Sequence, residues 1–250
     1  YGVECYLVDD LSKSVDPLPE EDLDTPLKER SVVVFDLETT GFSPEKNRII
    51  EIGAVRIVDG KIRDRFSQFV NPQIPIPFKI QQLTGIGDNM VARAKTIDII
   101  LPHFLRFCEG SVLVGHNVAF DIGFIRANAA RLGLPCRFTT VDTLGIARAL
   151  QPGHAKYTLD AVAKRLNVSL ENHHRAVDDA QCTAEIYLKM LPLLEDQQVL
   201  SLRQIEDFCI PTPDTIKRLR THHCILIAKN TTGRTNLYTM ISESHMTYFF

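Results

Sequence analysis

The sequence predicts a mixed α/β domain, a sheet covered by helices, from three observations. Short apolar runs rich in β-branched residues fill its first half, an Asp-Gly pair separates two of these runs, and apolar residues at helical spacing dominate its second half. A strand-rich half followed by a helix-rich half is typical of a mixed sheet on which helices pack. With 250 residues, of which 44% are hydrophobic and 24% charged, the chain is long enough to bury a full core.

Strands are expected at 31–36, 49–58, 62–70 and 111–115. The first (SVVVFD) and the last (SVLVG) are short and uniformly apolar, which is typical of strands buried on both faces. The second and third flank Asp59-Gly60, and such a pair between alternating runs indicates a two-residue hairpin.

Helices are expected at 96–108, 119–131, 143–150, 159–166 and 176–191. The first of them carries apolar residues three and four apart, which places these residues on one helix face. Beyond Pro192 the sequence becomes amphipathic and polar, and this tail does not obviously continue the domain. It is expected to form a strand at 224–228 and a helix at 235–245.

The segment 11–30 is acidic, holds three prolines and shows no apolar period, so it is interpreted as a linker that buries no core. The chain begins with Tyr1 and ends on Phe249-Phe250, directly after a helix-like stretch. These ends favour a piece of a longer polypeptide.

Charge and cysteine content narrow the classes of protein. The formal net charge of -3 argues against binding of nucleic acid through a broad basic surface, so any nucleic acid must be held locally. The six cysteines form no CxxC pair, which indicates neither a disulfide framework nor a zinc module and favours a reducing compartment. No secretion signal or membrane-spanning run is recognised, so a soluble, cytoplasmic protein without a membrane partner is expected.

The first candidate site residues are Asp36 and Glu38, at the end of the first expected strand. Residues two apart in an extended backbone point to the same face, so both carboxylates project together. Adjacent anions repel, and a divalent cation is the usual remedy. An ordinary strand end with acidic turn residues is the alternative.

A second group, GHNVAFD at 115–121, lies where a strand leads into a helix. Asp121 falls in the first turn of that helix, where the helix dipole favours an anion. The same preference explains an acid there without any catalytic role. His116 and Asn117 are equally compatible with simple turn formation.

A third group, HHRAVDD at 173–179, begins the last long helix and offers two competing carboxylates. At about 100° per residue, Asp178 shares a face with polar and charged residues, whereas Asp179 aligns with Ile186 and Met190. An acid directed at the interior needs a partner, which a metal supplies. Asp179 is therefore the candidate ligand, and Asp178 is interpreted as a surface charge.

Taken in order, these residues resemble the three motifs of the DEDDh exonucleases. The matching patterns are Asp36-x-Glu38 followed by Thr-Thr-Gly, His-Asn-x-x-x-Asp121, and His174-x-Ala-x-x-Asp179. Each motif alone is weak, but the ordered set on these elements is specific. The resemblance covers residues 31–191 and implies a ribonuclease H-like mixed β-sheet with helices on both faces. The family includes proofreading subunits and domains of bacterial replicative polymerases.

The resemblance implies that two magnesium or manganese ions are held by Asp36, Glu38, Asp121 and Asp179. Two such ions about 4 Å apart stabilise the attacking and leaving oxygens of a phosphoryl displacement. His174 would be the general base, and an ordinary histidine pKa of about 6.5 suits that task. The neighbouring His173 is expected to face solvent or to cap the helix.

The same resemblance implies that the terminal nucleotide of a single-stranded DNA 3′ end is contacted by Thr39, Thr40, Gly41, Phe42, His116 and Asn117. Phe42 would be an apolar wedge against the base, with a place in the core as the alternative. His116 and Asn117 would organise that part of the site.

Both ends of the chain resemble parts of the PHP domain of bacterial DNA polymerase III alpha subunits. The PHP metal ligands would correspond to Glu4 and His223, which are too few for a closed metal site, and ordinary strand residues are the alternative. In the PolC type of this subunit the exonuclease is inserted within the PHP domain. This predicts a PHP-like segment at 1–10, a linker at 11–30, an exonuclease domain at 31–195 and a PHP-like continuation at 196–250.

The favoured hypothesis is a proofreading 3′-5′ exonuclease that works with the rest of a PolC-type replicative polymerase. A stand-alone epsilon-like proofreading subunit and an RNA 3′-exonuclease are alternatives, because the metal chemistry does not distinguish the sugars. The PHP-like ends disfavour the RNA enzyme. A non-catalytic binding module is disfavoured by the presence of all four acids plus His174, since buried carboxylates without a metal are costly.

Overall fold

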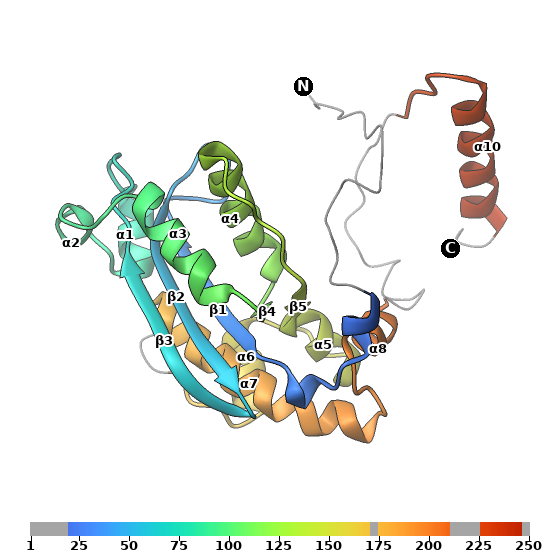
Figure 1. The fold of residues 1–250 in the computed structure, drawn as a ribbon, viewed down its shortest axis with the longest axis horizontal. Coiled ribbons are helices and arrows are strands. Elements are labelled where there is room, and N and C mark those ends of the chain that lie inside the picture. Colours follow the sequence, from blue (N-terminus) through green and yellow to red (C-terminus); the bar gives the residue numbers. More distant parts are fainter. Residues whose placement is uncertain (1–19, 171–174, 211–225, 247–250) are drawn as a thin grey trace. The chain divides into compact units, whose positions relative to one another are not determined.

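The computed structural model describes residues 20–170, 175–210 and 226–246. The chain divides into two compact units, Tyr1–Cys209 and Ile210–Phe250. The first unit is built around a five-stranded sheet with helices on both faces (Figure 1). The α/β fold class predicted from the sequence is confirmed.

The sheet is mixed, and its strands lie in the order β3-β2-β1-β4-β5. The strands are β1 (Val32–Thr39), β2 (Ile49–Val58), β3 (Lys61–Phe69), β4 (Val112–Gly115) and β5 (Thr140–Asp142). The first three are antiparallel neighbours, whereas β4 and β5 run parallel to β1. The predicted hairpin is present, with positive φ at both Asp59 (51°) and Gly60 (68°), as a type I′ turn requires.

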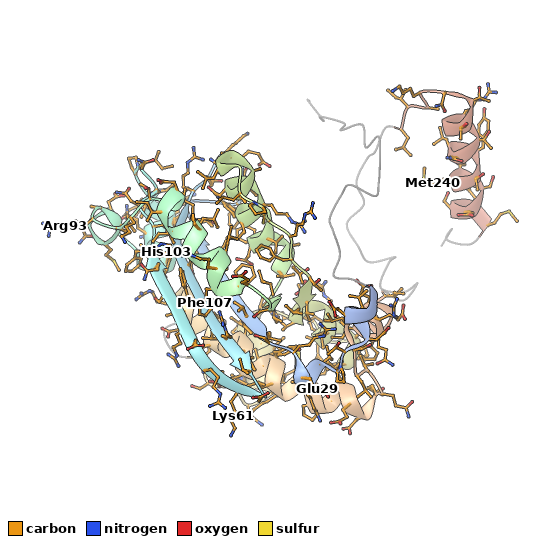
Figure 2. The ribbon with its side chains drawn as sticks, viewed as in Figure 1. Glu29, Lys61, Arg93, His103, Phe107 and Met240 are labelled. Atoms are coloured by element: carbon orange, nitrogen blue, oxygen red, sulfur yellow. The ribbon has the colours of Figure 1, made fainter. Side chains whose placement is uncertain are left out.

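The alternation of β1 separates two apolar cores. Val32 and Val34 contact the cluster that contains the buried residues of α7, whereas Val33 and Phe35 belong to the cluster on the other face, with α3 and α4. On that second face the Arg56 guanidinium carbon lies 4.7 Å from the ring centroid of Phe107 of α3, which Figure 2 labels. A strand buried on both faces is thus the centre of the domain.

The longer helices agree with the sequence prediction, and several short elements were not predicted. The helices of this unit are α1 (Phe78–Thr84), α2 (Asp88–Val91), α3 (Ile97–Cys108), α4 (Val118–Leu132), α5 (Thr143–Leu150), α6 (Leu159–Arg165), α7 (Ala176–Asp196) and α8 (Leu202–Phe208). The unpredicted α1, α2 and β5 have seven, four and three residues, and such short elements give only a weak period.

The domain continues beyond the boundary expected at residue 195. Helix α7 carries Pro192 in its interior and ends only at Asp196. Leu202 and Ile205 of α8 are buried in the same core as α7. The sequence beyond Pro192 was not expected to continue the domain. For the residues up to the end of α8 this expectation is wrong, because the apolar residues of α8 pack on the domain.

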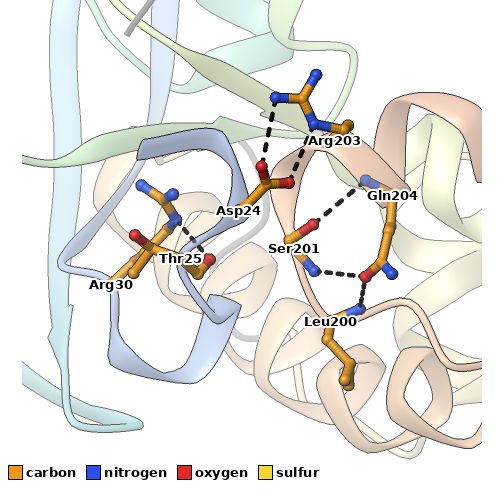
Figure 3. A network of polar contacts seen from close by, with 7 residues as sticks. All are labelled: Asp24, Thr25, Arg30, Leu200, Ser201, Arg203 and Gln204. Carbon is orange, nitrogen blue, oxygen red and sulfur yellow. Dashed lines mark hydrogen bonds and ion pairs between the residues drawn. The ribbon is translucent and has the colours of Figure 1, made fainter. Parts of the chain in front are cut away.

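The described part of the expected linker also packs on the domain. Two 3₁₀ helices, η2 (Glu20–Asp24) and η3 (Leu27–Glu29), form there. Leu27 is buried in the core, and its N–H donates to the Leu200 carbonyl at 2.8 Å. Asp24 is ion-paired with Arg203 of α8 (Figure 3). The expectation that this segment buries no core is wrong here. A single leucine, Leu27, attaches it to the core, and one leucine produces no apolar period in the sequence.

The second unit contains helix α10 (Thr231–Met246), which includes the predicted helix 235–245 and has no buried residue. Residues 226–228 of the predicted strand 224–228 are not extended into a strand. Glu4 and His223 lie outside the described residues, as does the segment 1–10. Within the described ranges, no helix is both long and apolar enough to cross a membrane.

Candidate active site

Strand β1 delivers two of the predicted acids to one place. Asp36 and Glu38 pair with Gly53 and Glu51 of β2, and a register shift follows between Glu38 and Thr39. Both carboxylates are half-buried. Because they stand two residues apart on a strand, they share one face of the sheet, as the sequence predicts.

Helix α4 brings Asp121 to the same strand. The parallel strand β4 lies beside β1 and ends at Gly115, and α4 begins three residues later. Asp121 is buried in the first turn, and its Oδ1 accepts a hydrogen bond from the Leu37 N–H at 3.2 Å. This contact joins the helix to the backbone between the two β1 acids.

Helix α7 brings Asp179 into the cluster. Carboxylate oxygens of Asp36, Glu38 and Asp179 all lie within 4.8 Å of one another, and Asp179 is buried. Close approach of α7 to β2 depends on Gly53, where an added Cβ would lie 2.1 Å from the backbone carbon of Ala176. Real Cβ atoms do not approach backbone so closely, so only glycine allows α7 to begin there.

Burial and neighbouring charges raise the pKa of Asp36, Glu38 and Asp121. Burial raises the pKa of Asp36 well above its usual range, and the charges of Asp121, Glu38 and Asp179 raise it further. Burial, with Asp179, also raises the pKa of Glu38 to about 8, against a lowering effect of Arg175. Burial raises the pKa of Asp121 to about 8 although the Leu37 N–H favours its charged form.

This donor set fits divalent cations. Carboxylate oxygens are the ligands that magnesium and manganese prefer, and these acids are held close together where burial makes their charges costly. Arg175 is the cation that lowers the pKa of Glu38, but its guanidinium is already ion-paired with Glu51 at 2.9 Å. A bound cation would supply the positive charge that the cluster requires.

Glu51 and Arg175 are site residues that the sequence analysis did not identify. The Glu51 side chain is 1% exposed and accepts from Arg175 and from the Ala176 N–H. The available signal was a single acid within the otherwise apolar β2 run IIEIGAV. A charged residue at a buried strand position needs a specific partner.

The Thr-Thr-Gly-Phe segment forms a turn after β1. The Thr39 hydroxyl donates to the Gly41 carbonyl at 2.7 Å, and the Thr40 hydroxyl accepts from the Arg48 N–H at 2.9 Å. Phe42 is 82% exposed, and its ring lies edge-on to Phe120 with 6.3 Å between centroids. This exposure excludes the alternative that Phe42 belongs to the core.

His116 is held by the protein on both ring nitrogens. Its Nε2 is 2.7 Å from the Tyr157 carbonyl oxygen, and its Nδ1 is 2.9 Å from the Thr143 hydroxyl. A carbonyl can only accept, so Nε2 carries the proton. Burial lowers the pKa of His116, which favours the neutral ring. The adjacent Asn117 is exposed in the left-handed conformation, and its N–H donates to Asp142.

The described structure contains only part of the third motif. His173 and His174 lie outside the described residues, which resume at Arg175. Asp178 is half-buried and is not a member of the carboxylate cluster formed with Asp179. A separate cavity of about 960 Å³, lined by Arg30, Arg106 and Phe138 among others, contains none of the predicted site residues.

Comparison with known proteins agrees with this geometry. Residues 33–187 match the model of a family described as exonuclease. The whole chain is 46% identical to a PolC-type DNA polymerase III of Clostridium perfringens and 44% identical to that of Caldanaerobacter subterraneus subsp. tengcongensis, and it spans 17% of the length of each. The solved structure of exonuclease X in complex with 5′ overhanging duplex DNA is 28% identical, with a TM-score of 0.54 over 71% of this chain and 99% of that one.

Proposed function

We propose that this chain, which belongs to the exonuclease family, removes nucleotides from DNA 3′ ends. It would act as the proofreading nuclease of a PolC-type DNA polymerase III. The observation that carries the proposal is the convergence of Asp36, Glu38 and Asp179 on one point, with Asp121 attached to the same strand. These acids come from three separate parts of the sequence. Carboxylates that come together only in the folded state, although they repel one another, are typical of a functional site.

We assign the cation ligands to Asp36, Glu38, Asp121 and Asp179. Two magnesium or manganese ions bound there would stabilise charge on the attacking and leaving oxygens of the phosphodiester. The acids themselves fix where the scissile phosphate is held. Because Asp121 is tied to the Leu37 backbone, its orientation is set before substrate binds.

The proposed general base is His174, which directly precedes Arg175 in the chain. It would take a proton from the attacking water, and its role is inferred from its place in the third motif. The exposed Phe42 ring, supported by Phe120, is available to stack against the terminal base. The turn that holds Phe42 in place is formed by Thr39, Thr40 and Gly41.

The proposed setting is a longer polypeptide, because the relatives that match the whole chain are about six times its length by the 17% that it spans. DNA is the favoured substrate because those relatives are DNA polymerases and exonuclease X was solved with DNA. The rest of the polymerase is the proposed partner. The PHP-like ends and the cytoplasmic location stay predictions.

A polarity assay tests this proposal. Oligonucleotides labelled at the 5′ end, of DNA and of RNA and with matched or mismatched 3′ termini, would be incubated with the chain in Mg²⁺, in Mn²⁺ or in chelator. We expect stepwise shortening from the 3′ end of DNA, faster at the mismatch and absent in chelator. Faster shortening of RNA would favour the RNA exonuclease instead. No cleavage of either polymer in either metal would contradict the nuclease assignment.

A further inference from the structure

We propose that Glu51, through Arg175 and the first N–H of α7, is a positioning residue that orients Asp179 of the third motif towards the β1 acids. The proposal rests on the nuclease function proposed above, and it adds a residue that lies outside the three motifs. Its basis is the set of contacts that Glu51 makes between β2 and the beginning of α7.

Glu51 uses both carboxylate oxygens on the beginning of α7. Its Oε1 accepts from Arg175 Nη2 at 2.9 Å, and its Oε2 accepts from Arg175 Nε at 3.3 Å and from the Ala176 N–H at 3.1 Å. The paired Arg–carboxylate geometry fixes direction as well as distance. Since the Glu51 side chain is 1% exposed, water does not compete for these bonds.

Helix α7 lacks a cap of its own, and Glu51 supplies one. The N-cap residue is Arg175, whose side chain makes no capping hydrogen bond. The first N–H groups of a helix have no partner within the helix, and a carboxylate there also interacts favourably with the helix dipole. Here the acceptor comes from β2, a strand that is far away in sequence.

This cap acts where the third motif is placed. Asp179 lies three residues after Ala176, and its N–H donates to the Arg175 carbonyl at 2.9 Å. Arg175 is thereby bound through its side chain to Glu51 and through its backbone to Asp179. It is also the residue bonded to His174 in the chain. Fixing Arg175 therefore constrains the position of Asp179, the candidate metal ligand.

Glu51 differs from the metal ligands although it lies beside them. It pairs with Glu38 across β1 and β2, yet the cluster of mutually close carboxylate oxygens consists of Asp36, Glu38 and Asp179. The oxygens of Glu51 are occupied by three N–H donors. Its charge contributes to the raised pKa of Asp36 and Glu38, after burial and the nearer acids, and its hydrogen bonds act on α7.

The test compares Glu51→Gln and Arg175→Gln with the unaltered chain on single-stranded DNA in Mg²⁺. We expect Glu51→Gln to lower kcat about 10- to 100-fold, the usual cost of losing a residue that orients a ligand, and to raise the Mg²⁺ concentration for half-maximal rate. KM for DNA should change little, because the Glu51 side chain is 1% exposed and its oxygens are bound to Arg175 and Ala176. In the double variant the losses should not multiply, since both residues act through one contact.

Measurements of folding and of rate decide the outcome. Circular dichroism and Tm establish that each variant is folded, and Asp24→Asn, which breaks the remote ion pair with Arg203, is the matched control with unchanged kcat. A folded Glu51→Gln with wild-type kcat and Mg²⁺ dependence would overturn the proposal. If Glu51→Gln does not fold, Arg175→Gln decides alone: its side chain is 37% exposed, and unaltered kcat there also overturns it. An inactive unaltered chain would instead refute the proposed function.

Discussion

Two carboxylate environments in the domain contrast sharply. Asp24, whose side chain is 61% exposed, faces Arg203 with 3.0 Å between Oδ1 and Nε, as Figure 3 shows. Asp36 and Asp179 instead face other acids, and burial together with the charges around Asp36 raises its pKa. An exposed pair of this kind contributes little to stability, about 0 to 1 kcal/mol. The acid cluster costs stability, and the proposed cations would offset that cost.

Glu51 stands between these two environments. It is buried, as Asp121 and Asp179 are, but like Asp24 it has an arginine partner. Removing one member of a buried pair leaves an uncompensated charge, which is far more costly than breaking an exposed pair. Burial alone therefore does not identify a metal ligand; the distinguishing feature is a buried acid that faces other acids.

The largest expected effect is on nuclease activity, which should depend on the clustered acids and not on the exposed Asp24. Asp179→Asn should reduce Mg²⁺-dependent release of nucleotides more than about 100-fold, because loss of a direct ligand should exceed the loss of an orienting residue. Asp24→Asn should leave the rate unchanged. The measurement is the initial rate on a mismatched DNA primer, with folding checked by circular dichroism. Full activity of Asp179→Asn would remove it from the proposed ligand set.

The second expected effect is on stability, which should fall with rising pH when the cations are removed. Burial raises the pKa of Glu38 from 4.5, and that of Asp121 from 3.8, each to about 8 in the folded chain. Between the ordinary and the raised pKa values the folded state binds more protons than the unfolded state, so folding weakens as pH rises through this window. Saturating Mg²⁺ should oppose the loss, since it binds the charged acids.

Thermal unfolding in chelator and in Mg²⁺, from about pH 5 to about pH 8.5, measures this effect. The stabilisation by Mg²⁺ should grow with pH, and Asp36→Asn in chelator should flatten the pH dependence by removing one of the interacting acids. A metal-free chain that becomes more stable as pH rises through this window would contradict the electrostatic account.

The sequence indicated the clustered acids more clearly than the residues that hold α7 against β2. Asp36 and Glu38 follow from strand period, and Asp179 was preferred over Asp178 by helix period, because both periods act within one element. Glu51 could not be assigned, since its partner Arg175 is distant in sequence and their contact depends on how α7 packs on β2. Gly53 gave no signal either, because its importance is the approach of another backbone.

The extent of the domain was predicted less well for a related reason. Leu27 and the apolar residues of α8 join the core singly or in short elements, and neither produces a period that the sequence reveals. Long helices with sustained apolar faces, such as α3 and α7, were found close to their observed bounds. Periodicity identifies elements that bury many residues, and it misses elements that pack on the core through only one or two buried side chains.

The smallest expected effect concerns the two neighbouring acids of α7. Asp178→Ala should change the rate by no more than about twofold, since substitutions outside the interacting groups typically cost within about 0.5 kcal/mol. Asp178 is half-buried and outside the carboxylate cluster, although its charge, after the hydrogen bond and charge of Glu51, raises the pKa of Arg175. The same primer assay measures it. A severe loss here beside a harmless Asp179→Asn would show that α7 presents the other acid, because adjacent residues differ by about 100° around a helix and cannot both face the β1 acids.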